Sequence, residues 1–208
     1  MTVRALGTGG ADVTDGVAVD GARLPPPGLP GLEPAWSRLV TDARGHTWHV
    51  LDRDRRIAGR PGGTVVCVHG NPTWSYLWRG VVAAAPPGWR VVAVDQLGMG
   101  FSDRPPGVRT LARRVADLDA VLAALDVTGP VVVAGHDWGG IIGLGWAVAH
   151  HSRGDDAPGL DADAAVVPPA ASSPRRLAAL VLGNTAVHHP SDVPIPAPIR
   201  LARTPALR

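Results

Sequence analysis

Four short runs of consecutive, mostly β-branched apolar residues constrain the fold of this 208-residue chain more than any other feature. They are 64–68 (TVVCV), 90–94 (RVVAV), 130–134 (PVVVA) and 177–182 (LAALVL), and each is followed at once by glycine, aspartate or a His-Gly pair. Strands that are apolar without alternation are typical of a parallel sheet buried on both faces. The runs therefore predict the strands of such a sheet.

Segments with helical periodicity separate these runs. Apolar residues recur every three or four positions in 74–85 and 111–125, and 139–150 is apolar nearly all round. A hairpin-like pair, 37–41 and 46–51, precedes the first run. The alternation of strands and helices predicts an α/β fold with right-handed crossovers.

Two segments interrupt this organisation. Residues 1–30 are rich in glycine and proline and end in LPPPGLP, which indicates a flexible, disordered leader. Residues 152–174 stand where a short helix-to-strand loop is expected, and their composition indicates a disordered surface insertion.

Composition excludes several classes of protein. The net charge of +2, without a run of like charges, does not favour a nucleic-acid partner. A single cysteine, Cys67, excludes an intramolecular disulfide framework and a cysteine-based zinc cluster. No apolar stretch is long enough to span a membrane, and no signal peptide is visible. We therefore expect a cytoplasmic protein.

The segment 135–140 (GHDWGG) carries the sharpest chemical signal, because it joins a buried strand to an apolar helix. This is the nucleophile-elbow pattern, in which Gly135 and Gly139 allow a tight turn and Asp137 takes the nucleophile position. The helix N-terminus favours the ionised carboxylate, which attacks an electrophilic carbon and forms an ester. The alternative is a capping aspartate in a glycine-rich turn.

A second signal, 69–72 (HGNP), directly follows the first apolar run. Enzymes with such an elbow take one oxyanion-binding N–H from this loop and another from the residue after the nucleophile. Those residues are Asn71 and Trp138, whose side chains add two neutral donors suited to a small leaving anion. Taken singly, Asn71 is also a common turn residue and Trp138 a common core residue.

Three segments, 69–79, 95–105 and 135–140, resemble the haloalkane dehalogenase group of the α/β-hydrolase superfamily. The similarity runs from Trp36 to the end of the chain, apart from the insertion. Within this group, DQLGMGFSDR and NTAVHHP resemble the β-lactone decarboxylases of bacterial olefin synthesis. Epoxide hydrolases share the elbow but usually carry a large apolar residue where Asn71 stands.

The resemblance implies an α/β-hydrolase fold and an enzyme in which Asp137 forms a covalent ester. It implies a small, hydrophobic, electrophilic substrate, either a haloalkane or a β-lactone, and possible fusion or pathway partners in olefin synthesis. Asn71 and Trp138 would hold the halide or oxyanion. The supporting residues of the loop and elbow would be His69, Gly70, Gly135, His136 and Gly139. No cofactor is implied, and the adjacent histidine pairs 150–151 and 188–189 lack the spacing of metal ligands.

The chain departs from the family because no residue matches its general-base histidine or the acid that orients it. Asn184 occupies one of the two acid positions, and His188 and His189 lie near the expected cap boundary. We therefore expect an N-terminal portion, truncated before the cap and the last strands, that is inactive or limited to one turnover. Its core would span 31–187, and 188–208 would begin the cap.

Three alternatives remain. The chain is a catalytically incomplete α/β module, an epoxide hydrolase-like enzyme, or an interaction protein that uses its proline-rich leader.

Overall fold

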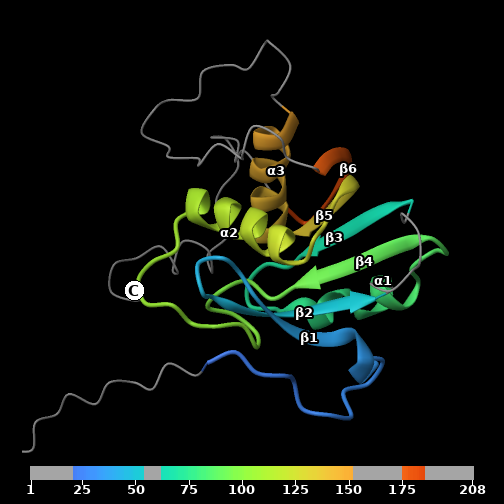
Figure 1. Cartoon of the computed structure of the whole chain (residues 1–208), viewed down its shortest axis with the longest axis vertical. Coiled ribbons are helices and arrows are strands. Elements are labelled where there is room, and N and C mark those ends of the chain that lie inside the picture. Colours follow the sequence, from blue (N-terminus) through green and yellow to red (C-terminus); the bar gives the residue numbers. More distant parts are fainter. Residues whose placement is uncertain (1–20, 54–61, 152–174, 186–208) are drawn as a thin grey trace, which may run out of the picture.

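A single mixed sheet forms the centre of the molecule, in a computed structural model that describes residues 21–53, 62–151 and 175–185 (Figure 1). The strand order is β1-β2-β4-β3-β5-β6. Strands β3 to β6 run parallel, whereas β2 is antiparallel to both β1 and β4. The expected mostly parallel α/β sheet is therefore confirmed. The strands are β1 (Ser37–Thr41), β2 (Thr47–Arg53), β3 (Gly63–Val68), β4 (Trp89–Val94), β5 (Gly129–His136) and β6 (Arg175–Gly183).

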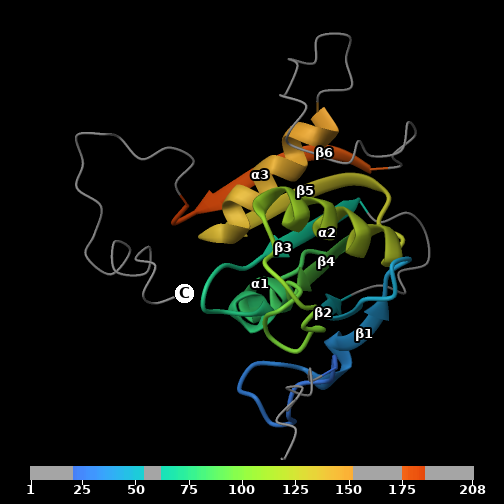
Figure 2. The same ribbon diagram turned by 90° about the vertical axis from the view of Figure 1, so that its left-hand side faces the viewer.

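Helices cover both faces of the sheet. Helices α2 (Leu111–Ala124) and α3 (Trp138–His151) pack on one face, with α3 lying along β5 and β6 (Figure 2). The short α1 (Arg79–Ala83) packs on the other face, against β2 and β4. Alternate strand residues such as Val66 and Cys67 enter the two separate apolar cores. Within the described ranges, no helix is long and apolar enough to cross a membrane.

The segment expected as one helix over 74–85 is divided. It consists of a 3₁₀ turn, η2 (Ser75–Trp78), followed by α1, and Trp74 before it is extended. The helix ends at Ala83 because two prolines, Pro86 and Pro87, follow and disfavour helical backbone in front of them. The apolar spacing therefore indicated a helix in this segment but not its short length or the 3₁₀ turn that precedes it.

Strand β6 is one of the two edge strands of the sheet in the described part of the chain, and β1 is the other. The apolar residues of this strand are only partly covered. Leu177 and Leu180 pack against the α2–α3 core, but Val181 is 58% exposed and Leu182 is 40% exposed. An exposed edge of this kind presents unpaired backbone groups to other strands.

Residues 21–30 lie against the domain, which differs from the leader expected over 1–30. The backbone N–H of Ala22 donates to Asp103 Oδ1 at 2.8 Å, and the Tyr76 hydroxyl donates to the carbonyl of Pro30 at 2.7 Å. Side chains far along the chain therefore hold a segment whose own sequence contains no apolar periodicity. The rest of the expected leader, the insertion at 152–174 and the cap segment 188–208 lie outside the described residues.

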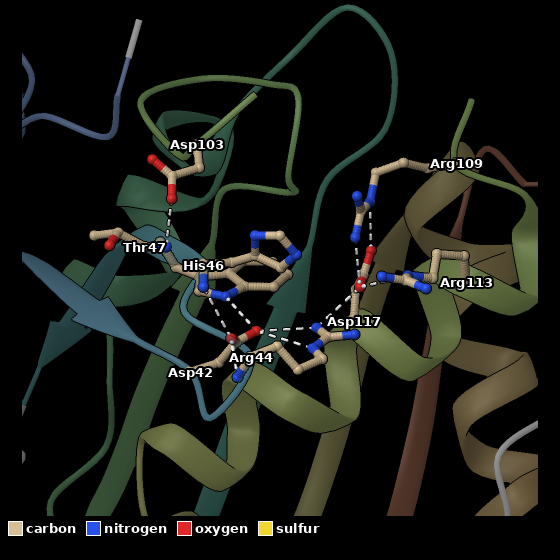
Figure 3. A network of polar contacts seen from close by, with 9 residues as sticks. Asp42, Arg44, His46, Thr47, Asp103, Arg109, Arg113 and Asp117 are labelled. Carbon is tan, nitrogen blue, oxygen red and sulfur yellow. Dashed lines mark hydrogen bonds and ion pairs between the residues drawn. The ribbon is translucent and has the colours of Figure 1, made fainter. Parts of the chain in front are cut away.

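A network of charged side chains ties the β1–β2 turn to helix α2 (Figure 3). In the turn, the Arg44 side chain contacts Asp42 at 2.9 Å, and it reaches Asp117 of α2 at 3.0 Å. Asp117 also accepts two hydrogen bonds from Arg109, at 2.7 and 2.8 Å. Because Asp117 is buried, these ion pairs are screened less than surface pairs.

We predict that Asp117→Asn lowers the free energy of unfolding by about 1–3 kcal/mol, because Arg44, Arg109 and Arg113 lose the carboxylate that they share. Urea unfolding followed by circular dichroism measures the change. Asp126→Asn is the matched control, since Asp126 is exposed and asparagine tolerates its positive φ of 52°. Equal stability of the two variants would contradict the prediction.

Candidate active site

Asp137 lies in the turn between β5 and α3, as the sequence predicts. Its φ is +53°, a backbone conformation that residues other than glycine rarely adopt. Its carbonyl accepts the N–H of Gly140 at 3.0 Å, which closes the first turn of the helix. The half-buried carboxylate therefore stands at the N-terminus of α3, where the helix dipole favours negative charge.

The glycines of the elbow are required by close backbone approach. A Cβ at Gly139 would collide with the carbonyl oxygen of Val68, and one at Gly135 would lie 2.6 Å from the carbonyl oxygen of Gly139. Gly70 faces the elbow from the neighbouring loop, and a Cβ there would overlap the Asp137 carboxylate. The elbow and the loop thus touch without side chains between them.

The loop after β3 brings Asn71 to the carboxylate. Strand β3 pairs in parallel with β5, and Val68 lies opposite Gly135, so the two strands end at the same level. The backbone N–H of Asn71 consequently donates to Asp137 Oδ2 at 2.9 Å. This N–H therefore faces a carboxylate oxygen, where a donor stabilises negative charge.

The two expected side-chain donors are both accessible. Trp138 follows Asp137 directly, and its side chain is exposed, as is Asn71. In the part of the chain that the structure describes, neither the Trp138 indole N–H nor the Asn71 amide makes a hydrogen bond. Both donors can therefore turn towards a ligand at the carboxylate.

His69 is fully buried behind the loop, and both of its ring nitrogens are engaged. Nδ1 lies 3.0 Å from the carbonyl oxygen of Gly70, and the N–H of Gln96 donates to Nε2 at 3.0 Å. Burial lowers the pKa of the imidazole. A neutral ring that donates from Nδ1 and accepts at Nε2 satisfies these contacts, so His69 supports the loop and has no nitrogen left for substrate chemistry.

His136 lies on the other side of Asp137. The Asn184 amide lies 3.4 Å from Nε2 of its ring, whereas Nδ1 is buried and has no partner among the described residues. Asn184 therefore contacts a histidine that directly precedes Asp137. His188 and His189 lie outside the described residues.

Sequence reasoning missed two residues that hold the elbow, one at the end of β6 and one shortly after it. The carbonyl of Gly183 accepts the N–H of Asp137 at 3.1 Å, and the Thr185 hydroxyl donates to the carbonyl of Asp137 at 2.8 Å. Thr185 also packs on Gly140, where a Cβ would lie 2.5 Å from its side chain. The signal that could have found them is their position directly after the apolar run 177–182. Neighbouring parallel strands end at the same edge of the sheet, so residues that follow this run lie near the end of β5.

Asp95 stabilises the segment that follows β3 and the Asn71 loop. Its buried carboxylate accepts the backbone N–H of Ser75 at 2.7 Å and lies 3.0 Å from Nδ1 of His49. Phe101 donates a third hydrogen bond, from its backbone N–H, at 2.8 Å. Burial alone would raise the pKa of the Asp95 carboxyl, but these hydrogen bonds outweigh burial and hold the pKa below its ordinary value of 3.8.

The arrangement combines a carboxylate, a backbone donor and two accessible side-chain donors at the carboxyl edge of the sheet, where ligands bind in open α/β folds. In residues 21–53, 62–151 and 175–185, no group of three or more His, Cys, Asp or Glu side chains is placed to hold a metal ion.

The chain belongs to the α/β hydrolase fold family. The family model of that description matches residues 63–194, which is more than half of the chain.

Two curated relatives bear the expected resemblance out. The chain is 47% identical to a cis-3-alkyl-4-alkyloxetan-2-one decarboxylase of Xanthomonas campestris over 100 residues, which cover 44% of this chain and 33% of the relative. It is 41% identical to a haloalkane dehalogenase of Sphingobium indicum over 127 residues, which cover 59% and 41% respectively. The matches thus span well under half the length of these relatives.

Solved structures with a similar fold agree with this family assignment. A mutant of the haloalkane dehalogenase DatA from Agrobacterium tumefaciens superposes with a TM-score of 0.51 at 29% identity, covering 72% of this chain and 42% of DatA. An epoxide hydrolase from metagenomes of hot environments superposes with a TM-score of 0.54 at 21% identity, covering 72% and 42%. The second similarity supports the fold alone.

We predict that Gly139→Ala lowers the free energy of unfolding by about 3 kcal/mol, because the new methyl group meets the rigid backbone of β3. Gly80→Ala is the control, since nothing lies within 4 Å of a Cβ there. That change in helix α1 should stabilise the protein by up to about 1 kcal/mol. Thermal or urea unfolding of both variants decides the matter, and an unperturbed Gly139→Ala protein would refute the elbow geometry.

A second prediction concerns acid stability. The depressed pKa of Asp95 means that its carboxylate stabilises the fold above the unfolded-state pKa, and that this contribution is lost as the pH falls through the folded-state pKa. Asp95→Asn removes the titrating group, so stability should fall at pH 7 and its decline below about pH 4 should become shallower. Urea unfolding at several pH values tests this, and parallel acid limbs for variant and wild type would contradict it.

Proposed function

We propose that Asp137 is a nucleophile that attacks an electrophilic carbon of a small hydrophobic substrate and forms a covalent ester. The observation that carries this proposal is the carboxylate in the strained turn, with one oxygen bound by the Asn71 N–H at 2.9 Å. That hydrogen bond holds Oδ2 in place, so Oδ1 is the oxygen that attacks the substrate carbon. Asn71 and Trp138 stabilise the leaving anion through their accessible side-chain donors.

We infer that the substrate is a β-lactone. The 47% identity with the oxetanone decarboxylase favours this class, as does the DQLGMGFSDR segment. Asp137 attacks the alkyl-bearing ring carbon that is bonded to the ring oxygen. The bond between that carbon and the ring oxygen breaks, so the ring opens and the lactone carbonyl group becomes a free carboxylate. That carboxylate then leaves as CO₂, its bonding electrons form the alkene, and Asp137 is expelled as a carboxylate.

This second step returns the enzyme without water, so it requires no general-base histidine. Haloalkane dehalogenation is the second candidate, favoured by the 41% identity with a dehalogenase and by the paired donors. There the halide leaves, and hydrolysis of the ester needs water activated by a base.

The wider assignment follows from the same proposal. The chain acts in the cytoplasm, and its pathway partners are the enzymes that make the lactone in olefin synthesis, either fused to it or encoded nearby. The genes beside its own test this: thiolase-like, ligase-like or reductase-like neighbours support it, and their absence counts against the olefin pathway.

The chemical test is intact-mass spectrometry of the 208-residue chain incubated with a 1-haloalkane or with a cis-dialkyl β-lactone. We expect one equivalent of alkyl ester from the haloalkane, confined to the peptide that contains Asp137. The haloalkane is thus held to the single turnover expected from the sequence. The lactone differs from that expectation, because its second step releases Asp137 without water, and it should yield alkene and CO₂ over repeated turnovers, slowly compared with a closed active site that excludes water.

Asp137→Asn keeps the shape of the side chain but removes the nucleophile, so it should form neither the ester nor the alkene. Asp126→Asn, at an exposed site with a similar positive φ, should behave as wild type. Equal adduct in Asp137→Asn would overturn the proposed nucleophile. Repeated haloalkane turnover would show that a base exists within the chain, with His188 and His189 the first residues to test.

A further inference from the structure

The peptide group that joins Gly70 to Asn71 is hydrogen-bonded on both of its sides. Its N–H donates to Asp137 Oδ2 at 2.9 Å. Its carbonyl oxygen meets three donors: the Thr73 hydroxyl at 2.9 Å, the Thr73 backbone N–H at 3.0 Å and His69 Nδ1 at 3.0 Å. A carbonyl oxygen has two lone pairs, so this acceptor is fully occupied.

Hydrogen bonds to the oxygen of an amide strengthen its N–H as a donor. Electron density moves from nitrogen to oxygen through the partial double bond, and linked hydrogen bonds reinforce one another. We propose that Thr73 is a positioning residue of the site, which acts through the peptide between Gly70 and Asn71 to strengthen the hydrogen bond to Asp137. No hydrogen bond joins Thr73 to a side-chain oxygen of Asp137 in the described part of the chain, so the proposed effect passes through the peptide group.

His69, the third donor to the Gly70 carbonyl, is held in place by hydrogen bonds that lead through Gln96 to helix α2. Gln96 donates its backbone N–H to His69 Nε2 and its side-chain amide to the His69 carbonyl, so the ring presents Nδ1–H towards Gly70. Arg114 of α2 donates to Gln96 Oε1 at 2.9 Å. The chain of hydrogen bonds from Arg114 therefore ends on the same carbonyl that Thr73 contacts.

The proposed function determines which chemical step this polarised N–H serves, and this part of the inference rests on it. Formation of the ester removes charge from the Asp137 carboxylate, so a stronger donor gives that step no advantage. Attack on the ester carbonyl places negative charge on the oxygen next to the Asn71 N–H, and expulsion of the carboxylate does the same. Thr73 should therefore speed breakdown of the ester and leave its formation nearly unchanged.

The direct test needs no catalysis. We expect the amide proton of Asn71 to resonate far downfield in the ¹H–¹⁵N spectrum and to move upfield in Thr73→Val, which lacks the hydroxyl but keeps the shape. Thr73→Ser should restore the position. Thr41→Val removes an exposed hydroxyl from the end of β1 and should change nothing at Asn71. An unmoved Asn71 resonance in Thr73→Val overturns the proposal.

The kinetic test uses the alkyl ester on Asp137, cleaved by added hydroxylamine, which attacks the ester carbonyl without needing a histidine. Thr73→Val should slow this cleavage about three- to tenfold, the effect of one hydrogen bond, with ester formation changed less than about twofold. Thr73→Ser should recover the wild-type rate. Equal slowing of both steps would indicate a merely structural role.

Two controls keep the outcomes distinct. If Thr73→Val loses its circular dichroism spectrum, Thr73→Ala removes the same hydroxyl with less bulk and takes its place. If the wild-type chain forms no ester on Asp137, the proposed function fails while the resonance of Asn71 still decides the role of Thr73.

Discussion

The parallel pairing of β3 with β5 is the constraint on which the candidate site depends. Val68 lies opposite Gly135, so both strands end together, and the loop of one meets the elbow of the other. Backbone contact at Gly139 and Gly70 leaves no room for a side chain between them. A shift of one residue in this register would separate the Asn71 N–H from the carboxylate and move every strand side chain to the opposite face.

Buried polar groups beneath the loops give this meeting point its rigidity. Asp95 takes hydrogen bonds from a histidine ring and from two backbone N–H groups, and Gln96 beside it binds His69 on two sides. Unsatisfied polar groups at such depth would cost several kcal/mol, so each partner restricts the others to one arrangement. The loops around Asp137 are therefore held by polar contacts that apolar packing could not supply.

Much of the fold was readable because its signals are local. The β-branched runs predicted β3, β4, β5 and β6, since strands buried on both faces need apolar residues throughout. The helical periods predicted α2 and α3 nearly to their ends. Residues 21–30 were misjudged as part of a leader because glycine and proline have no periodicity, whereas their hydrogen bonds to Asp103 and Tyr76 come from distant parts of the chain.

The sequence by itself determined which groups stand at the candidate site: Asp137 at the turn, the small residues that permit the turn, and Asn71 after the neighbouring strand. Tertiary structure decided what holds them. Gly183 and Thr185 bind the backbone of Asp137, and Thr73 joins His69 on the Gly70 carbonyl. No spacing rule could foresee most of these partners, because a hydrogen bond between residues far apart in the chain depends on strand order and register, which exist only once the sheet has formed.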